Sequence, residues 1–395
     1  MVPDDPIVIC GAARTPIGGF QGDFKDLTAP QLGAIAIRAA VERAGLGPDA
    51  IDEVLFGCVL PAGVGQAPAR QASMGAGLKP STGATTVNKV CGSGMKAAML
   101  AHDLLVAGSA RVAVAGGMES MTNAPYLLDR ARAGYRLGHQ RALDHMFLDG
   151  LEDAYDKGRL MGTFAEKCAS MYSFTRAEQD AYSLESLKRA QKAGSDGSFA
   201  AETVPVIVKE RGVERVVSQD EQPLKAKPEK IPLLKPAFDE NGTVTAGNSS
   251  SISDGAAALV LMRRTEAERR GIAPKAVIVG HATYSQEPSL FTTAPIGAIR
   301  RLLARTGWTI DEVDLFEINE AFAVVAMAAM RDLGLPHEKV NVHGGACALG
   351  HPIGASGARL IVTLLAALEK YGLRRGIASL CIGGGEAVAM AVERV

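Results

Sequence analysis

The sequence predicts an α/β fold built from two similar halves, together with an inserted segment that resembles neither half. Two observations support this prediction. Short apolar runs that suit buried strands alternate with longer runs whose apolar residues recur at helical spacing, which is typical of a sheet covered by helices. In addition, the first part of the chain has a recognisable copy in the last part.

The internal repeat consists of four matches in the same order along the chain. Residues 7–13 match 276–282, 28–35 match 293–299, 51–56 match 310–316, and the glycine-containing run 112–119 matches 380–386. The repeat predicts a first half over residues 1–119, completed by about 249–271, and a second half over 272–395. Residues 120–248 are then an inserted loop domain, and such insertions usually shape or cover a site.

The expected elements follow from hydrophobic periodicity and from helix-ending residues. In the first half we expect strands at 6–11, 51–57, 84–87 and 110–117, and helices at 27–44, 67–78 and 95–107. The inserted segment is expected to contain helices at 143–156, 162–173 and 177–193, and the second half a helix at 358–368. The basic run Arg130, Arg132, Arg136 and Arg141 suits a solvated face, although it could also meet a partner subunit or an anionic ligand.

Composition excludes several classes of protein. The 42 basic and 43 acidic residues balance, which argues against a general binder of nucleic acid or of membrane surfaces. The six cysteines form no CxxC pair and no zinc-like spacing, so we expect a reducing compartment and no metal site. The acidic N-terminus is unlike a targeting segment and no apolar run is long enough to span a membrane, so we expect a cytoplasmic protein.

Cys91 is the first residue with a chemical interpretation. It lies just before the predicted helix 95–107, where free N–H groups and the helix dipole favour a negative charge, so we expect a lowered thiol pKa and a nucleophile. Taken alone, it could equally be a small buried thiol. Gly92 and Gly94 allow a ligand or backbone to approach the sulfur.

Three further residues could act with Cys91. His351, in the glycine-rich loop of the second half, is a candidate base, or alone a loop histidine with a satisfied hydrogen bond. Cys381 ends a predicted strand and is followed by three glycines, or alone is a buried strand thiol. Asn319 follows another strand and could instead be a helix N-cap.

Four motifs around these residues together resemble those of the thiolase family. They are Asn-Lys-Val-Cys91-Gly-Ser-Gly, Asn319-Glu-Ala-Phe, Gly350-His351-Pro-Ile-Gly and Cys381-Ile-Gly383-Gly-Gly. They occur in the family's order, and the resemblance extends from the first strand to the last. It implies the duplicated thiolase-like fold, and residues 242–250 resemble the thiolase segment that lies along coenzyme A.

The resemblance implies a reversible Claisen condensation of two acetyl-CoA to acetoacetyl-CoA and CoA, by ping-pong chemistry. It gives Cys91 the role of acyl acceptor, assisted by His351, and Cys381 the transfer of the α-carbon proton. His351 with a water held by Asn319 would stabilise the enolate, and the N–H groups of Cys91 and Gly383 the tetrahedral intermediate. No cofactor is implied beyond the coenzyme A thioesters, which are substrates, and we expect a homotetramer.

The resemblance also places a set of residues along the thioester substrate: Leu151, Met161, Lys225, Phe238, Ala246, Ser250, Ile252, Phe291, Ala321 and Phe322. Two departures affect this set. Leu160 stands where many thiolases have a histidine, and Leu224-Lys225 stand where family members often have an arginine against the adenine nucleotide, so Lys225 could substitute for it. Phe291 lies in a loop that departs from the family pattern and is expected to border the acyl pocket.

Two other functions fit parts of the sequence. A degradative 3-ketoacyl-CoA thiolase with longer-chain preference would share every motif, and rates on a chain-length series would distinguish it. A non-catalytic acyl-CoA carrier would be free to lose Cys91, Asn319, His351 or Cys381, and all four are present. A nicotinamide dehydrogenase is excluded by the absence of GxGxxG after a strand.

Overall fold

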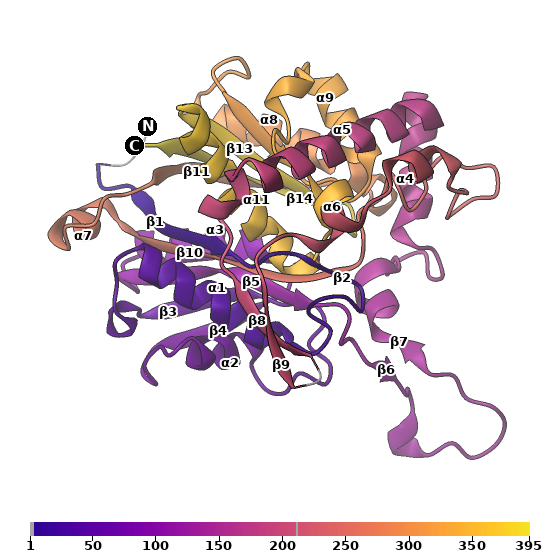
Figure 1. The fold of residues 1–395 in the computed structure, drawn as a ribbon, viewed down its shortest axis with the longest axis horizontal. Helices are drawn as coiled ribbons and strands as arrows, with labels where there is room; N and C mark the ends of the chain where they lie inside the picture. The colour runs from indigo at the N-terminus through magenta and orange to yellow at the C-terminus, as the bar shows by residue number, and fades with distance from the viewer. Residues whose placement is uncertain (1–3, 211) are drawn as a thin grey trace.

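A computed structural model describes residues 4–210 and 212–395. Its described residues contain a ten-stranded mixed sheet that runs through both halves of the chain, in the order β12-β13-β14-β11-β1-β10-β5-β3-β4, with β2 paired to β10. The first half (indigo to purple) and the second half (orange to yellow) occupy separate parts of the molecule in Figure 1. The α/β class is therefore confirmed.

The strands of the second half follow the same order as those of the first, counted outward in opposite directions from the centre of the sheet. Those of the first half are β1 (Ile7–Arg14), β2 (Gly18–Gly19), β3 (Glu53–Gly57), β4 (Gly83–Val87), β5 (Val112–Ser120) and β10 (Ser253–Arg263). Those of the second half are β11 (Ala276–Ser285), β12 (Leu315–Ile318), β13 (Arg375–Ile382) and β14 (Glu386–Arg394). The halves meet where β1 pairs antiparallel with β11, at Val8 opposite Val277 and Ile9 opposite Ala276.

The pairing pattern repeats between the halves. β3 runs parallel to β5 and β12 parallel to β13, while β1 is antiparallel to β10 and β11 antiparallel to β14. Even a local irregularity is shared, because the register shifts between Ile9 and Gly11 in β1 and between Ile278 and Gly280 in β11. This bulge lets β1 continue to Arg14 beyond the predicted end at Gly11.

Two of the four sequence matches, 51–56 with 310–316 and 112–119 with 380–386, are wrong in register. Asp52 accepts hydrogen bonds from the backbone N–H of Arg111 and Val112, and Asp314 accepts them from Arg374 and Arg375. Asp52 therefore corresponds to Asp314 and not to Asp311, and Val112 corresponds to Arg375 and not to residue 380. The two glycine runs differ in structure as well: residues 116–117 lie within β5, whereas residues 383–385 form the turn between β13 and β14.

Two helices pack between the strands of both halves. α3 (Ser93–Val106) contacts β3, β5, β10 and β14, and α11 (Ile353–Tyr371) contacts β5, β10, β12 and β13. They cross closely, because a Cβ on Gly357 would lie 2.3 Å from the Met95 nitrogen and one on Gly94 would lie 2.8 Å from the Ala358 nitrogen. Glycine at these positions therefore sets the spacing of the two helices, whose N-terminal ends carry Cys91 and His351.

The other helices cover the outer faces or fill connections. α1 (Ala29–Arg43) and α2 (Pro68–Gly75) pack on the first half, and α8 (Ala294–Thr306) and α9 (Ala323–Leu333) on the second. Short elements are α7 (Arg264–Arg269), α10 (Ala346–Leu349) and the turns Pro48–Ala50, Ala131–Ala133, Phe147–Leu151, Ser198–Ala201, Pro228–Leu233, Pro288–Thr293 and His337–Lys339. In the part of the chain that the structure describes, no helix combines the length and apolar character that crossing a membrane requires.

The inserted segment is only partly as predicted. α4 (Met161–Tyr172) and α5 (Arg176–Ser195) match the expected helices, and α6 (Glu221–Lys225) and the hairpin β8 (Val206–Glu210) to β9 (Val213–Val217) are additions. The helix expected at 143–156 is wrong: this stretch holds the short strand β7 (Leu143–Asp144) and a single π turn. Asp144 and Asp153 accept hydrogen bonds from N–H groups two and three residues ahead, which competes with helical bonding.

A buried ionic network fastens the inserted segment to both halves. The Arg14 guanidinium donates to Glu202 at 2.5 Å and to both Asp220 oxygens at 2.7 and 2.9 Å. Thr363 on α11 also donates to Glu202, at 3.1 Å. All of these groups are buried. β1, α11 and the inserted segment are thus held in one fixed arrangement.

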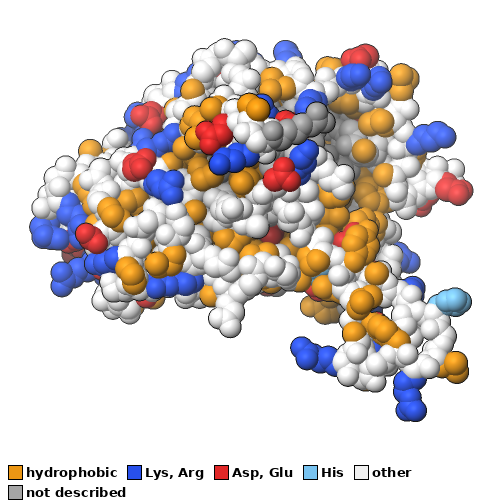
Figure 2. Space-filling model, turned by 60° about the horizontal axis from the view of Figure 1, so that its bottom comes forward, with side chains coloured by type: hydrophobic (Ala, Val, Ile, Leu, Met, Phe, Trp, Pro, Cys, Tyr) orange, Lys and Arg blue, Asp and Glu red, His pale blue; other side chains and the backbone are white. Residues whose placement is uncertain are grey.

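A projecting arm is the part of the inserted segment that does not pack on the body. It runs from β6 (Tyr126–Leu127) to β7 and stands away from the molecule in Figure 1. In Figure 2 hydrophobic and basic side chains gather on it. Its Leu128 and Leu137 are 59% and 94% exposed, which is unusual for large apolar residues of a packed domain.

Candidate active site

Cys91 is held by a tight turn at the end of the connection from β4 to α3. Asn88 Oδ1 accepts a hydrogen bond from the Val90 N–H, and Ser93 Oγ accepts from Lys89 N–H at 2.8 Å while donating to Val90 O at 2.6 Å. The turn forces Val90 to φ +46°, a left-handed conformation that is costly for a β-branched residue. Backbone strain of this kind, kept in place by these side-chain hydrogen bonds, fixes the position of the next residue, Cys91.

The expected lowering of the Cys91 pKa is wrong. Cys91 does lie just before α3, whose N-cap is Gly92. Burial nevertheless raises the thiol pKa to about 11, although the backbone N–H groups of Gly383 and of Cys91 itself favour the thiolate. The desolvation penalty therefore exceeds the stabilisation by nearby N–H groups, and the thiol needs a base to ionise it.

His351 is placed as a neutral base. Ser356 Oγ donates to the Pro352 carbonyl, so it accepts a hydrogen bond from His351 Nδ1, 2.5 Å away. That assigns the ring proton to Nδ1 and leaves Nε2 with a free lone pair, and Nε2 has no partner among the described residues. Burial, with a smaller contribution from Arg359, lowers the pKa of His351 to about 3.

Asn319 lies at the end of β12 with its side-chain amide unused. Both the amide nitrogen and oxygen are buried and lack a hydrogen-bond partner within the described part of the chain. The alternative role as a helix N-cap does not apply, because the N-cap of α9 is Phe322. A buried polar group with no partner is rare and calls for a water or a ligand.

Cys381 lies at the end of β13, directly before the glycine turn. It is fully buried, and its pKa is raised well above the ordinary thiol value, first by burial and then by charge on Cys91. Gly383 contributes its N–H to the Cys91 sulfur, so the turn after β13 and the turn before α3 meet at one point.

Some of the predicted substrate residues pack beside Cys91 and the glycine turn, and others lie further along the chain's apolar core. Leu151 and Ile252 pack with Cys91 against the same apolar cluster, and a Cβ on Gly383 would lie 3.3 Å from the Met161 sulfur. Ser250 donates through both its N–H and its hydroxyl to the Ala321 carbonyl. The aromatic residues of the predicted set pack with one another or near Cys381. The rings of Phe238 and Phe322 have centroids 6.0 Å apart, and Phe291 is buried in the same apolar cluster as Cys381.

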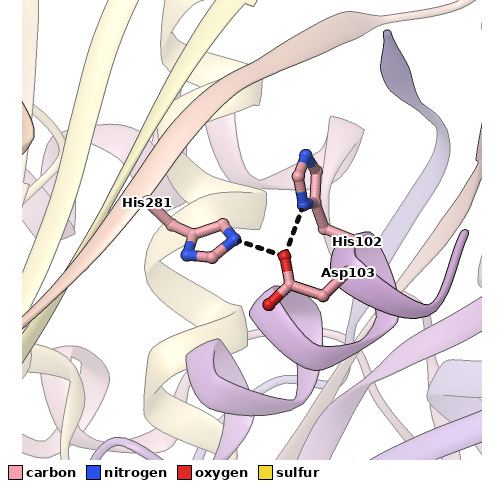
Figure 3. Close-up of side chains that lie close together, drawn as sticks. All are labelled: His102, Asp103 and His281. Carbon is pink, nitrogen blue, oxygen red and sulfur yellow. Dashed lines mark hydrogen bonds and ion pairs between the residues drawn. The ribbon is translucent and has the colours of Figure 1, made fainter. Parts of the chain in front are cut away.

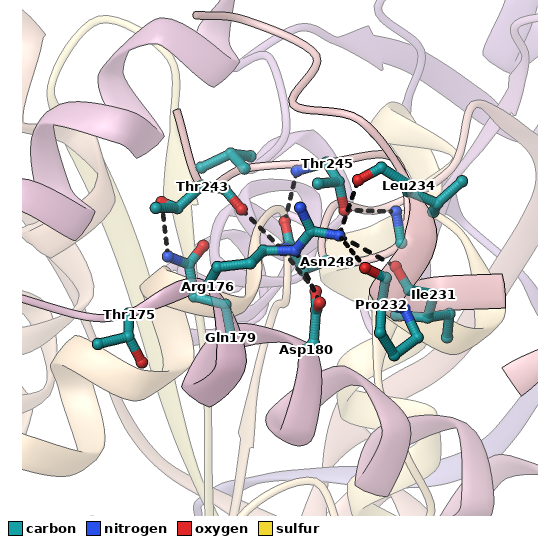
Figure 4. Close-up of polar contacts among 12 residues, drawn as sticks. Thr175, Arg176, Gln179, Asp180, Ile231, Pro232, Leu234, Thr243, Thr245 and Asn248 are labelled. Carbon is teal, nitrogen blue, oxygen red and sulfur yellow. Dashed lines mark hydrogen bonds and ion pairs between the residues drawn. The ribbon is translucent and has the colours of Figure 1, made fainter. Parts of the chain in front are cut away.

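The segment that holds Ala246 and Ser250 is clamped from α5. Figure 4 shows Arg176 and Asp180 of α5 between this segment and residues 231–234. Arg176 pairs with Asp180 at 2.7 Å and donates to the carbonyls of residues 231, 232 and 234. Asn248 donates to Asp180 and to the Thr243 carbonyl and accepts from Thr245 N–H. The inserted segment thus fixes one side of the site.

A separate cluster joins α3 to β11 away from these residues. The Asp103 Oδ1 atom lies 3.0 Å from His102 Nδ1 and 3.0 Å from His281 Nε2, so it can accept from both rings (Figure 3). The three potential ligand atoms lie within 4.8 Å of one another. The carboxylate is satisfied by the two rings, and Lys96 adds positive charge near His281. We interpret the cluster as a hydrogen-bonded link between the two halves.

Comparison with known families decides the relationship. The thiolase N-terminal domain matches residues 7–265, and the thiolase C-terminal domain matches residues 272–394. The chain belongs to the thiolase family. A protein of Chromobacterium violaceum described as acetyl-CoA acetyltransferase is 47% identical over 390 residues, covering 98% of this chain and 99% of its own. The acetyl-CoA acetyltransferase 2 of Arabidopsis thaliana is 50% identical over 391 residues, covering 98% and 96%.

A solved structure is similar over the whole length. The crystal structure of the Bacillus anthracis acetyl-CoA acetyltransferase has a TM-score of 0.96 and 41% sequence identity, covering 99% of each chain. The thiolase resemblance drawn from four motifs and the duplicated α/β fold are therefore confirmed.

The departures of this thiolase from the family motifs change one side of the site. Leu224 is 66% exposed, and the neighbouring Lys225 pairs with Glu221. Lys225 lines a cavity of about 270 Å³ together with Ala246 and two lysines that sequence reasoning missed, Lys227 and Lys230. The described lining of this cavity contains no carboxylate. The clustering of lysines in the run Lys-Ala-Lys-Pro-Glu-Lys, residues 225–230, could have indicated this basic cavity lining.

Proposed function

We propose that this thiolase catalyses the reversible condensation of two acetyl-CoA to acetoacetyl-CoA and CoA through an acyl-Cys91 intermediate. The observation that carries the proposal is the hydrogen bond from the Gly383 N–H to the Cys91 sulfur, which joins the turn after Cys381 to the Cys91 turn. The unpartnered Nε2 of His351 and the unused amide of Asn319 would supply the base and the water-binding group. Relatives described as acetyl-CoA acetyltransferases, 45–50% identical over nearly the full length, support the choice of substrate.

The first half-reaction forms the acyl-enzyme. His351 Nε2 takes the proton of the Cys91 thiol, and the sulfur attacks the thioester carbonyl. The carbon–sulfur bond to coenzyme A then breaks, and His351 returns its proton to the leaving thiolate. The low pKa of His351 keeps Nε2 unprotonated at neutral pH, and the raised pKa of Cys91 explains why a base is needed.

The second half-reaction forms the new carbon–carbon bond. Acylation of Cys91 removes the charge that, after burial, raises the Cys381 pKa, and Cys381 gives up its thiol proton to solvent. The Cys381 thiolate then removes a proton from the α-carbon of the second acetyl-CoA, and the enolate oxygen is stabilised by His351 and a water held by Asn319. The carbanion attacks the acyl carbonyl. The resulting oxyanion accepts hydrogen bonds from the N–H groups of Cys91 and Gly383. The Cys91 thiolate leaves and regains the proton held by Cys381. Each such donor contributes on the order of 3 kcal/mol to the transition state.

The substrate contacts form the next part of the proposal. Leu151, Met161, Phe238, Ala246, Ser250, Ile252, Ala321 and Phe322 would line the pantetheine path, Phe291 the acyl pocket, and Lys225 the nucleotide end. The packing of Leu151 and Ile252 beside Cys91, and of Met161 beside Gly383, supports the assignment at the reacting end. A degradative thiolase with longer-chain preference is the second candidate, because the loop that contains Phe291 departs from the family motif.

The domain organisation, the assembly and the location of the protein complete the proposal. We propose the division into a first half (1–119 with 249–271), an inserted domain (120–248) and a second half (272–395). We propose a homotetramer, supported by the exposed apolar residues of the projecting arm. We propose a cytoplasmic location, supported by the free state of all six cysteines.

Two variants and a substrate series test the function. Cys91→Ser should form no acyl-enzyme with acetoacetyl-CoA by mass spectrometry of the intact protein, whereas Cys381→Ser should become acylated and yet lose condensation. Full labelling of Cys91→Ser, or wild-type condensation by Cys381→Ser, would contradict the assigned roles. Thiolysis rates that rise with chain length beyond acetoacetyl-CoA would favour the degradative alternative.

A further inference from the structure

Glu119, near the end of β5, is a buried carboxylate that the reaction scheme above does not use. Its Oε2 accepts hydrogen bonds from the backbone N–H of Val59 at 3.0 Å and of Gly354 at 2.9 Å. Its Oε1 accepts from Leu60 N–H at 3.1 Å and from the Cys58 thiol at 3.7 Å. One fully buried side chain thus binds a loop from each half of the molecule.

Both loops form the walls of the catalytic site. Residues 58–60 follow β3, and residues 351–354 connect His351 to the start of α11. Val59, Leu60 and Ile353 belong to the apolar cluster against which Cys91 packs. Asn88, in the Cys91 turn, reaches the Val59 carbonyl at 3.5 Å. The carboxylate therefore lies at the only described point where a single side chain holds the backbone on both the Cys91 and the His351 side.

The contact to the His351 loop is close. A Cβ on Gly354 would lie 2.6 Å from Glu119 Oε2, so only glycine lets the start of α11 come so near the carboxylate. The Gly354 N–H is one of the free donors of the first turn of α11, and an anion is favoured there. His351 precedes this N–H by three residues.

We propose that Glu119 is a positioning residue, which fixes the loop bearing His351 relative to the Cys91 turn for acyl transfer. The inference rests on the proposed function. Each of its two oxygens receives one N–H from the 59–60 loop, and Oε2 also receives that of Gly354. Loss of the carboxylate would release the His351 loop without altering the chemical identity of Cys91 or His351.

The charge of Glu119 gives the proposal a second readout. Burial raises the pKa of Glu119 to about 7, and the three N–H groups and the Cys58 thiol oppose this rise. The carboxylate in turn raises the pKa of the Cys91 thiol and of the Cys58 thiol, which are the titratable groups that respond to it. Neutralising Glu119 should therefore make Cys91 easier to ionise.

The Glu119→Gln variant separates the two effects. Its amide group places N–H donors opposite backbone N–H groups, so at least one loop must move. We expect alkylation of Cys91 by iodoacetamide, followed by mass spectrometry of the peptide, to shift to lower pH. We expect kcat for acetoacetyl-CoA thiolysis to fall ~10- to 100-fold, the cost of a small misplacement of catalytic groups, with KM unchanged.

Two further variants control the interpretation. Glu202→Gln neutralises a second fully buried carboxylate, which unlike Glu119 forms an ion pair, with Arg14. This variant should have a lower melting temperature and the wild-type kcat and alkylation profile. Glu119→Asp keeps the charge but shortens the side chain, so it should keep the wild-type alkylation profile and lose kcat. If Glu119→Gln does not fold, kcat of Glu119→Asp alone tests the positioning role of Glu119.

The opposite results would overturn the inference. Wild-type kcat in Glu119→Gln or Glu119→Asp would show that the carboxylate positions nothing needed for acyl transfer. A parallel fall of alkylation and thiolysis, matched by loss of folded protein in circular dichroism, would reduce Glu119 to a stabilising role. Failure of the wild-type protein to cleave acetoacetyl-CoA would instead contradict the proposed function, since the alkylation profiles remain measurable without it.

Discussion

Two buried histidines, His351 and His343, have depressed pKa values for the same physical reason. Burial penalises the imidazolium form and lowers the pKa of His351 to about 3 and that of His343 to about 4. For His351 the consequence is chemical, because the neutral ring keeps a free lone pair on Nε2. His343 packs on the rings of Phe199 and Tyr371, and neither of its nitrogens has a partner among the described residues.

His343 should therefore make stability depend on pH. Below the unfolded-state value of about 6.5, the unfolded chain binds a proton that folded His343 does not bind until pH 4. The contribution of neutral His343 to the free energy of unfolding is therefore complete above pH 6.5 and is lost as the pH falls towards 4. Between pH 7 and pH 5, wild type should lose about 2 kcal/mol more than His343→Phe in urea unfolding. Equal losses in the two proteins would contradict this.

At the scale of single residues, the sequence singled out four candidate residues but not their environment. Cys91, His351, Cys381 and Asn319 stand in short motifs that are recognisable from neighbouring residues alone. The raised pKa of Cys91 could not be predicted, because burial depends on packing by segments hundreds of residues away. Glu119 was missed for the same reason: its partners in residues 58–60 and 354 are distant in sequence.

At the scale of elements, prediction succeeded where local signals agree. α1 and α5 follow Thr caps with a capping box, and Gly108, with φ +76°, directly follows the C-cap residue of α3. The stretch 143–156 failed because two aspartates bond to their own backbone, which the hydrophobic spacing does not reveal. The hairpin β8–β9 alternates weakly and its strands are mostly exposed, so it offered little signal.

The crossing of α3 and α11 gives a prediction for an element pair. Gly357→Ala would place a methyl group 2.3 Å from the Met95 nitrogen, so the helices must separate and carry His351 away from Cys91. We expect a loss of about 1–3 kcal/mol in the free energy of unfolding. We also expect kcat for thiolysis to fall by roughly tenfold or more.

A matched glycine provides the control. Gly194 lies inside α5, where an added methyl group would meet no atom within 4 Å, so Gly194→Ala should stabilise by up to about 1 kcal/mol and leave kcat unchanged. If Gly357→Ala kept the wild-type kcat, helix spacing would not set the geometry of the catalytic pair.

At the scale of the whole molecule, the duplication was predictable and its junction was not. Repeated motifs revealed two halves, but the register of the last match was wrong because glycines recur for different reasons in β5 and in the turn after β13. The antiparallel contact between β1 and β11, which joins the halves into one sheet, carries no sequence signal beyond two apolar strands.

The projecting arm gives a prediction for assembly. Leu128→Ser with Leu137→Ser should lower the mass measured by sedimentation, because exposed apolar side chains of this size usually meet a partner. Thiolysis by the variant should persist, since the arm does not pack on the catalytic cluster. Leu233→Ser, at a 79% exposed leucine outside the arm, should leave the mass unchanged. An unaltered mass in the double variant would exclude the arm as an interface.

Lys275, at the start of β11, touches both extremities of the fold. Its N–H donates to the Ile9 carbonyl at 2.8 Å, and its carbonyl accepts from the Val395 N–H at 3.2 Å, so β1 and the last residue flank it. A circularly permuted gene is therefore feasible: a linker would join Val395 to Asp4, the first described residue, and the chain would open in the partly exposed loop after Gly271. The halves would then be translated in reverse order and still assemble the same pair of thiols.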